Sequence, residues 1–362
     1  MKILAIETSC DETAAAILEI KEEKDNLNFK VLANIIFSQI ESHRVFGGVV
    51  PNLAATLHLE NILPSIKKSF AKAKIEPQKL DFIAVTSGPG LAPALLVGVN
   101  TARTLAWLWQ KPLISVNHVE AHLLVNWLEI RKKNIFPAIG LVVSGGHTQL
   151  ILLKDFGQYQ LIGETRDDAA GEAFDKIARL LNLGYPGGPA IEKAAQNFKK
   201  VAISLPRPMI KSDNFDFSFS GLKTAVSLLV KERKLTQAEK NEFARAVQKT
   251  IIDVLVSKTL RAAKTYQIKT LVLSGGVAAN SYLRKEFKKA AKRQSLKLII
   301  PPINYCTDNA VMIGAAAYFK MQRVKDFSCP VNSKIDGTWQ KVVTEPDQEF
   351  IHVPEDRDFS SE

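Results

Sequence analysis

The sequence predicts a two-domain α/β protein with a cleft between related halves, and three features of the chain support this prediction. Apolar segments of strand length alternate with longer amphipathic segments along both halves, a pattern typical of helices packed on sheets. A strand, a polar turn and a second strand occur together twice, about 130 residues apart. The chain has 362 residues, whereas one domain usually has roughly 100–200.

The first half begins with a predicted β-hairpin. Strand Lys2–Glu7 enters the polar turn Thr8–Thr13, and strand Ala14–Glu19 leaves it, as alternating runs around a polar tip indicate. The remaining predicted elements are a helix, a strand, a helix and a strand, over Asn52–Ala73, Phe82–Ser87, Pro93–Trp109 and Leu113–Val116. The last strand leads directly into a further helix that contains His118 and His122.

The second half follows the link Arg131–Asn134 and repeats the opening pattern. Strand Ala138–Val143 enters the turn Ser144–Thr148, and strand Gln149–Leu153 leaves it. A long helix follows over Gln237–Ala263, and then a strand over Thr270–Leu273 with the glycine turn Ser274–Asn280. A further helix comes after this turn, and the last helix is expected over Asp308–Met321. From Ser328 onward the chain is polar and has no periodicity, which predicts irregular structure.

Composition excludes several classes of protein. With 46% hydrophobic and 23% charged residues, the chain has the material for a folded core and is not disordered. The most apolar stretch, Leu91–Trp109, contains Asn100 and Arg103 and falls short of the about 20 apolar residues of a membrane span. The three cysteines form no CxxC pair, which favours a reducing cytosol. We therefore expect a cytoplasmic protein that makes no membrane contact.

Positive charge is unevenly distributed along the chain. The formal net charge is +11, but residues 331–362 hold eight acidic and three basic residues, a local net of −5. The first 330 residues thus carry about +16. A polyanion such as nucleic acid is a candidate partner for this basic body. The alternative is that the basic clusters are the solvated faces of ordinary surface helices.

Two histidines indicate a metal site. His118 and His122 lie four residues apart, so on a helix they share one face and can bind one ion. Asp308 is the candidate third ligand, because two histidines and a carboxylate commonly hold iron or zinc. Two other interpretations remain open. The histidine pair could make hydrogen bonds at a helix N-terminus, and Asp308 could be an N-cap.

Glu120 bears on a rival interpretation, a zinc peptidase. Peptidases with the HExxH motif place the glutamate directly after the first histidine, where it acts as a base on metal-bound water. Here the order is His-Val-Glu-Ala-His, which turns Glu120 about 200° around the helix from His118. The order of residues disfavours a peptidase.

Several glycine turns favour a nucleotide cleft. The turns Ser144–Thr148 and Ser274–Val277 each follow an apolar strand, and Gly187 and Gly188 form a further pair. Glycines let backbone amides approach phosphate oxygens, and hydroxyl groups add donors. Three polar side chains could contact a ribose or base, with a helix cap or surface ion pairs as the alternatives. They are Asp175, Glu192 and Asn280.

Taken together, the motifs resemble the TsaD family, tRNA N6-adenosine threonylcarbamoyltransferase, once described as a glycoprotease. The resemblance extends to about Lys325 and rests on seven collinear motifs. They are residues 6–13 (IETSCDET), 118–122 (HVEAH), 143–148 (VSGGHT), 171–176 (GEAFDK), 184–189 (GYPGGP), 217–224 (FSFSGLKT) and 274–280 (SGGVAAN).

This resemblance implies an actin-like, Hsp70-like ATPase (ASKHA) fold with a nucleotide cleft between two related domains. We expect residues 1–130 plus 305–325 to form the first subdomain, because the C-terminal helix returns to it. Residues 131–304 would form the second subdomain, and residues 326–362 an irregular acidic tail. The tail is not part of the family pattern, and position 121 is Ala where the family usually has Gly.

The family's activity would be transfer of a threonylcarbamoyl group from threonylcarbamoyl-AMP to N6 of adenosine 37, beside the anticodon, in tRNAs that read codons beginning with A. The product is t6A. His118, His122 and Asp308 would hold one divalent metal ion, most typically Fe(2+), with Zn(2+) as the alternative. Asp11 and Glu12 would assist the transfer. The residues expected to bind the adenylate are Val142, Val143, Ser144, Gly145, Gly146, Asp175, Gly188, Glu192 and Asn280.

The resemblance also implies partners. The tRNA anticodon stem-loop is the acceptor, and bacterial members act with TsaB and TsaE and receive the adenylate from a TsaC-type enzyme. The lack of a fused kinase domain favours this bacterial arrangement. A catalytically silent nucleotide-binding subunit is a further alternative, which the complete set of metal and turn motifs disfavours.

Overall fold

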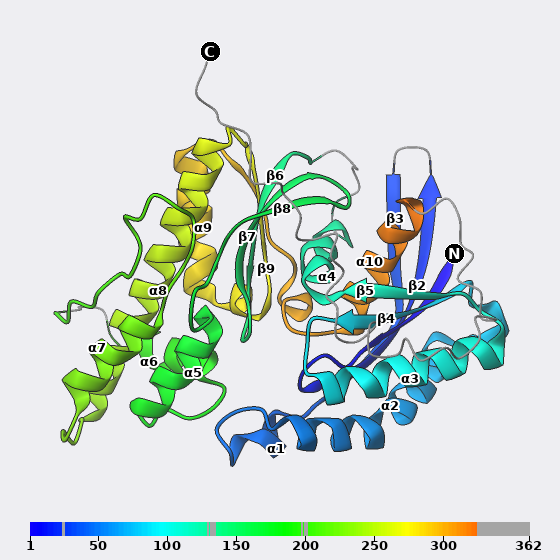
Figure 1. Ribbon diagram of the computed structural model, residues 1–362, viewed down its shortest axis with the longest axis horizontal. Helices are drawn as coiled ribbons and strands as arrows, with labels where there is room; N and C mark the ends of the chain where they lie inside the picture. Colours follow the sequence, from blue (N-terminus) through cyan, green and yellow to red (C-terminus); the bar gives the residue numbers. More distant parts are fainter. Residues whose placement is uncertain (24–25, 129, 131–134, 197, 199–201, 324–362) are drawn as a thin grey trace.

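The computed structural model describes residues 1–23, 26–128, 130, 135–196, 198 and 202–323. Two predictions lie outside the described residues: the link Arg131–Asn134 and the irregular acidic tail, 326–362. Figure 1 shows two sheets, with helices between them and on both outer sides. Of the helices described, none combines the length and the apolar character that crossing a bilayer requires.

Five strands form the sheet of the first half. The strands β1 (Lys2–Glu7), β2 (Glu12–Glu23) and β3 (Asn26–Ser38) pair antiparallel in succession. On the other side of β1, β4 (Phe82–Gly88) runs parallel to it, and β5 (Leu113–Asn117) runs parallel to β4. The order across the sheet is β3-β2-β1-β4-β5.

The second sheet repeats this topology. The strands β6 (Ala138–Val143), β7 (Thr148–Asp155) and β8 (Gln158–Glu164) pair antiparallel in succession. Parallel to β6 runs β9 (Thr270–Ser274), and parallel to β9 runs β10 (Lys297–Ile299). The order β10-β9-β6-β7-β8 is the order of the first sheet read from the other edge. The repeat expected from the sequence is therefore present as two sheets of the same strand order.

The helices form three further layers around the sheets (Figure 1). The helices α2 and α3 cover the outer face of the first sheet, α4 and α10 lie between the two sheets, and α5 to α9 lie on the outer side of the second sheet. Their bounds are α1 (Ile40–Arg44), α2 (Pro51–Ala73), α3 (Ala92–Trp109), α4 (His118–Leu124), α5 (Ala170–Leu180), α6 (Gly187–Gln196), α7 (Ser220–Val230), α8 (Gln237–Thr265), α9 (Ser281–Arg293) and α10 (Ala310–Arg323). The 3-10 turns are η1 (Pro77–Lys79), η2 (Val125–Leu128), η3 (Gly276–Ala279) and η4 (Ile303–Tyr305).

Successive side chains of the central strands pack in different hydrophobic cores. In β1, Ile3 and Ala5 pack in the layer of α4 and α10, whereas Leu4 and Ile6 pack against α2 and α3. This follows from the period of two in a strand, which sends successive side chains to opposite faces. Both faces of the sheet are buried, so β1 reads as a continuous apolar run rather than an alternating one.

Most predicted elements are confirmed, with ends that shift by a few residues. The predicted hairpin is β1 and β2, and the predicted long helix is α8, which a capping box at Thr236 and Glu239 begins. Three strands, β3, β8 and β10, were not predicted. All three are edge strands, and β3 and β8 each complete a three-stranded antiparallel unit with a predicted hairpin.

The predicted start of the last helix is wrong by two residues. The helix α10 begins at Ala310, and Asp308 lies in the bend before it. Asn309 caps the helix instead, because its Oδ1 accepts a hydrogen bond from the backbone N–H of Met312 at 3.1 Å. The N-cap alternative for Asp308 is therefore excluded, and its carboxylate is available for other contacts.

Candidate active site

A cavity of about 470 Å³ lies where the two halves meet. The parallel strands of both sheets point their carboxyl ends at it: it is lined by residues that follow β1, β4 and β5 in the first half and β6 and β9 in the second. Ligands of open α/β sheets bind at this end of the strands. The volume is that of a small-molecule site.

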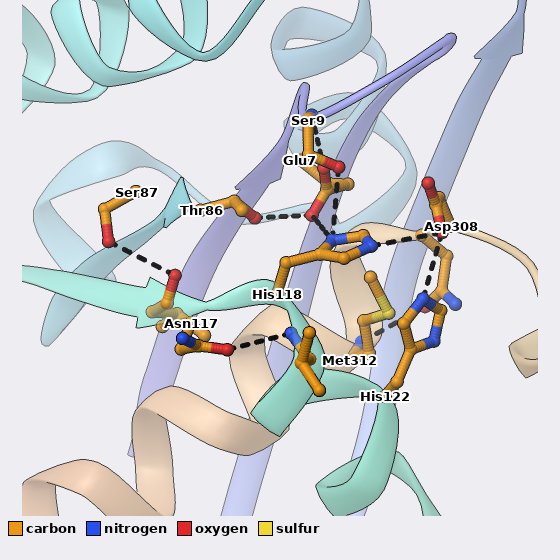
Figure 2. Close-up of polar contacts among 12 residues, drawn as sticks. Glu7, Ser9, Thr86, Ser87, Asn117, His118, His122, Asp308 and Met312 are labelled. Atoms are coloured by element: carbon orange, nitrogen blue, oxygen red, sulfur yellow. Dashed lines mark hydrogen bonds and ion pairs between the residues drawn. The ribbon is translucent and has the colours of Figure 1, made fainter. Parts of the chain in front are cut away.

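His118, His122 and Asp308 come together beside this cavity (Figure 2). The histidines lie at the first and fifth positions of α4, and Asp308 reaches them from the bend before α10. The Nε2 atoms of His118 and His122 are 3.6 and 3.1 Å from Oδ1 of Asp308. One ligand atom from each residue lies within 4.8 Å of the others. This donor set suits a first-row divalent ion such as iron or zinc.

The electrostatics of the cluster favour positive charge. Burial alone would lower the pKa of His118, but the carboxylates of Asp308 and Glu7 outweigh it and raise that pKa to about 9. Burial would raise the pKa of Asp308, but the two histidine rings hold it well below its usual range. The carboxylates that stabilise a protonated ring here would also stabilise a bound cation.

Glu7 supports the cluster from behind, and the sequence did not reveal this role. Its carboxylate lies 3.3 Å from Nδ1 of His118, on the side of the ring opposite Asp308. The hydroxyl of Thr86 and the backbone N–H of Ser9 both donate to it, the latter at 2.5 Å. A carboxylate behind a histidine fixes the ring and its tautomer in many metal sites. The only signal was a charged residue at the end of an apolar strand.

The predicted glycine turns form the second-half wall of the cavity. A Cβ added at Gly145, Gly146, Gly188 or Gly276 would meet no atom within 4 Å, and all four residues line the cavity. The backbone at these turns is therefore open to close approach by a bound group. Gly275, in contrast, has φ +89° and lies against the backbone of β6.

The polar residues predicted near the nucleotide also line the cavity, and each already has a partner. Asp175 accepts from the backbone N–H of Gly187 at 2.6 Å, and Glu192 accepts from the backbone N–H of Ser281 at 2.9 Å. Asn280 caps α9 through its Oδ1 and donates to Gln248 at 3.0 Å. The cap predicted as an alternative for Asn280 is thus present. Burial is the main reason that the pKa of Asp175 is raised to about 6.

Asp11 and Glu12 line the first-half wall, in the turn between β1 and β2. Burial, with the nearby carboxylates of Asp11 and Asp308, raises the pKa of Glu12 well above its usual value. His147 is a further lining residue that was not predicted. Burial lowers its pKa to about 4, so the ring is neutral and lies 6.3 Å, centroid to centroid, from the ring of His118.

Three predicted residues do not line the cavity. Val142 and Val143 are buried in β6, where their side chains pack in the central and outer cores respectively. His122 is fully buried behind Asp308. Ser144, Gly145, Gly146, Asp175, Gly188, Glu192 and Asn280 all line it, together with Asp11, Glu12, His118 and Asp308.

Glu120 points away from the cluster, as the helix geometry predicted. Its Oε1 accepts from the guanidinium of Arg323 at 2.9 Å, which ties α4 to the end of α10. It does not line the cavity. A carboxylate engaged there is not placed to activate water at the His118 and His122 pair.

Comparison with protein families gives one result over most of the chain. A family profile described as TsaD, tRNA N6-adenosine threonylcarbamoyltransferase, matches residues 30–315. A protein of that name from Thermosipho africanus is 47% identical over 318 residues, covering 88% of this chain and 94% of the relative. One from Syntrophomonas wolfei is 49% identical over 318 residues, with coverage of 88% and 91%. One from Clostridium botulinum is 45% identical over 335 residues, with coverage of 92% and 96%.

Solved structures show where else this fold occurs. Full-length HypF in its phosphate- and nucleotide-bound form matches with a TM-score of 0.58 at 14% identity, over 90% of this chain and 56% of HypF. Component A of the (R)-2-hydroxyglutaryl-CoA dehydratase of Acidaminococcus fermentans matches with a TM-score of 0.51 at 15% identity. The match covers 89% of this chain and 98% of component A. At these identities the likeness concerns the fold alone.

Proposed function

Because the chain belongs to the TsaD family of tRNA N6-adenosine threonylcarbamoyltransferases, we propose that the cavity between its halves holds threonylcarbamoyl-AMP beside a divalent metal ion. The observation that carries this proposal is that two walls of one cavity present different groups. One wall presents His118 and Asp308, and the other presents open glycine turns. The first suits a cation and the second suits the phosphate and sugar of an adenylate.

The enzyme transfers the threonylcarbamoyl group to N6 of adenosine in tRNA, which forms t6A. In this reaction the N6 nitrogen forms a bond to the carbamoyl carbon, the bond from that carbon to the phosphate oxygen breaks, and AMP leaves. One proton of the amine must be removed. The mixed anhydride is already activated, so the main tasks of the protein are positioning and proton transfer.

The proposed adenylate site is the second-half wall. Gly145, Gly146 and Gly188 offer backbone to the phosphate, because no atom lies within 4 Å of a Cβ placed there. Asp175 and Glu192 lie at the same wall as candidate acceptors for ribose hydroxyls. Asn280 would act through the geometry of the α9 N-terminus that it caps. The predicted roles of Val142 and Val143 are restricted to their backbone, since their side chains are buried.

The proposed metal site is His118, His122 and Asp308, with iron as the expected ion and zinc as the alternative. A divalent ion bound there would polarise the carbonyl of the threonylcarbamoyl group. Contacts on the far side of its ring orient His118: Ser9 and Glu7 both contact Nδ1, at 3.1 and 3.3 Å.

Asp11 and Glu12 are the proposed catalytic residues. They lie on the first-half wall, where the attacking amine would stand between them and the adenylate. The raised pKa of Glu12 makes its carboxylate a stronger base than an exposed one. Between the two, Glu12 is therefore the better candidate to accept the amine proton, because burial and then the carboxylate of Asp11 raise the pKa of Glu12.

The wider assignment follows the family. We propose the anticodon stem-loop as the acceptor, TsaB and TsaE as partners, a TsaC-type enzyme as the source of the adenylate, and the cytoplasm as the location. The proposed division into domains is 1–130 plus 305–325 and 131–304. The packing of α10 against β1, β2 and β5 supports the return of the C-terminal helix to the first half.

The experiment is a transfer reaction with defined components. Unmodified tRNA that reads an A-starting codon is incubated with the protein, threonylcarbamoyl-AMP and active partner proteins, and its nucleosides are analysed by mass spectrometry. We expect t6A, and its loss with Asp308→Ala. A reaction without t6A, in which all partners are verified active, would contradict the proposal. Chelator-sensitive cleavage of peptides that survives Asp308→Ala would favour the peptidase instead.

A further inference from the structure

A second cavity adjoins the first. Its volume is about 680 Å³, and it shares Asp175, Tyr185, Pro186 and Pro189 with the cavity described above. One side is formed by the end of α1 and the loop after it, and the other by α5, α6 and the loop between them. Figure 1 shows α1 at the edge of the first half that faces α5 and α6. The second cavity is therefore an approach to the first that both halves build.

Cations dominate the lining of this second cavity. Arg44, Arg179 and Lys193 line it, and among the described residues Asp175 is the one carboxylate in the lining. All three basic side chains are exposed. Arg44 pairs with Glu41 at 2.7 Å, but Glu41 is itself highly exposed, and such surface pairs exchange readily for stronger anionic partners. A groove with this balance of charge suits a backbone of phosphates.

Arg179 links the two sides of the cavity. Its guanidinium donates to the backbone carbonyl of Gly47, across the junction of the halves. Gly47 has φ +66°, and a Cβ at this position would lie 3.0 Å from the guanidinium. The close approach therefore depends on glycine. A ligand held by Arg44 and Lys193 would contact both halves at once.

The loop between two of the lining residues carries an exposed aromatic side chain. Phe46 is 60% exposed, between the lining residues Arg44 and Gly47. Backbone hydrogen bonds from Phe46 to His43 and from Gly47 to Arg44 hold the loop, and His43 is buried against Gln39. Single-stranded RNA is recognised by stacking of bases on such aromatic groups beside cations.

We propose that this second cavity binds the sugar-phosphate backbone of the RNA loop on either side of the reacting adenosine, with Arg44 and Lys193 at phosphates and Phe46 stacked on a neighbouring base. The inference rests on the proposed function, because it assumes that the reacting amine enters the first cavity. A nucleotide whose base enters that cavity keeps its own phosphates at the mouth. The second cavity adjoins the first and is lined by cations, and the exposed Phe46 lies on the loop between two of its lining residues.

The test is binding of a fluorescein-labelled, unmodified anticodon stem-loop, measured by anisotropy at several salt concentrations. The double variant Arg44→Gln, Lys193→Gln should bind about tenfold or more weakly at 0.1 M salt, and the slope of log K against log salt should fall by about 1.4. Phe46→Ala should weaken binding about fivefold or more with an unchanged slope. The control Lys288→Gln, Lys292→Gln, two exposed lysines of α9 outside both cavities, should bind within about twofold of wild type.

Transfer kinetics separate this inference from the proposed function. The variants at Arg44 and Lys193 should raise KM for RNA and leave kcat close to the wild-type value. Wild-type affinity and KM in these variants, with t6A still formed, would overturn the inference and leave the function intact. Unchanged RNA affinity with weakened binding of a partner subunit would assign the cavity to a protein interface and overturn it as well. If RNA binding depends on these residues but neither wild type nor the variants form t6A, the proposed role of the second cavity is supported and the proposed function is rejected.

Discussion

At the scale of residues, the fold holds side chains that are far apart in the sequence at one point. His118 and Asp308 are separated by 190 positions, and Glu7 lies 111 positions before His118. The contact of Glu7 with His118 and the contacts of Asp308 with both histidines join β1, α4 and the bend before α10. Small changes in any of these side chains should therefore alter metal binding before they alter the fold.

Glu7→Gln tests the outer support of the cluster. The amide keeps the shape of the side chain but loses the charge that faces Nδ1 of His118. We expect metal affinity to fall about 10–100-fold, as changes behind a ligand usually cause. The measurement is titration with metal of protein from which a chelator has removed the metal, with circular dichroism as a check on folding. The control is Glu19→Gln, a carboxylate in β2 that pairs with Lys2 near the surface; an equal loss in both variants would contradict the role of Glu7.

Asp175→Asn tests the electrostatics of the second-half wall. The folded pKa of Asp175 is about 6 and the ordinary value is 3.8, so ionisation destabilises the folded state and stability is lost as pH rises through 6. The difference corresponds to about 3 kcal/mol as an upper bound. The variant should therefore be more stable than wild type at pH 7.5, with the gain vanishing near pH 4, in urea unfolding at both pH values.

Asp167→Asn should behave in the opposite way. Burial would raise the pKa of Asp167, but hydrogen bonds from Ser218, Ser220 and the backbone N–H of Phe219 lower it. A lowered pKa stabilises the folded state above the ordinary value of 3.8 and loses that effect as pH falls. The variant should be less stable than wild type at pH 7.5 and closer to it near pH 3. The same sign in both variants would contradict the electrostatic account.

The sequence predicted the residues of the cluster better than their surroundings. The spacing of His118 and His122 carries a helical signal, and a carboxylate at the expected start of the last helix suggested Asp308. Glu7 could not be predicted, because one carboxylate at the end of a strand has no spacing partner. Its role depends on the parallel pairing of β1 with β4 and of β4 with β5, which brings β5 and the start of α4 beside it.

At the scale of elements, glycines set how closely helices approach the cavity turns. A Cβ at Gly171, in the first turn of α5, would lie 2.5 Å from the backbone oxygen of Ser144. A Cβ at Gly221, in the first turn of α7, would lie 3.6 Å from one carbon of Pro208, an ordinary contact. Both glycines lie in the first turn of a helix, but only Gly171 lies directly against the backbone of another segment.

Gly171→Ala should displace α5 from the Ser144 turn. We expect a loss of about 1–3 kcal/mol in the free energy of unfolding and weaker binding of an adenylate analogue, since Ser144 and Gly145 line the cavity. Gly221→Ala should leave stability unchanged or raise it by up to about 1 kcal/mol, because alanine favours a helix. The two variants are compared by urea unfolding and isothermal titration, and equal stability of both would argue against tight packing at Gly171.

Elements were predicted where the pattern was strong and missed at the edges. Buried strands such as β1, β6 and β9 are apolar in their interiors and were predicted to within one residue. The edge strands β3 and β8 mix polar and apolar residues, since one edge faces solvent, and their strand signal is weaker. The start of α10 was misplaced because Asp and Asn are both favoured N-caps, and only the Asn309 contact with Met312 decides between them.

At the scale of the whole molecule, two sheets of equal strand order place their carboxyl edges at a shared cavity. The sequence predicted this duplication from its repeated strand, turn and strand. It could not predict that α4 and α10 would fill the layer between the sheets, because both helices are apolar on most faces and their partners lie far away in the sequence.

A ligand that contacts both halves should stabilise the whole molecule. A non-reactive analogue of threonylcarbamoyl-AMP at 100 times its Kd should add about 2.7 kcal/mol and raise Tm by about 3–8 °C. Gly145→Val fills space that is open in the cavity wall, so this variant should retain its own Tm and lose the shift. Scanning calorimetry measures the Tm of each protein with and without the analogue. An equal shift in wild type and variant would mean that the analogue binds away from Gly145.

The central claim is that one cavity holds the metal and the adenylate on opposite walls. A crystal structure of the protein with that analogue, with anomalous data at the iron and zinc edges, tests it most directly. We predict an anomalous peak among His118, His122 and Asp308, with the phosphate of the analogue against Gly145, Gly146 and Gly188. A metal bound elsewhere, or an analogue whose phosphate lies outside these turns, would contradict the account.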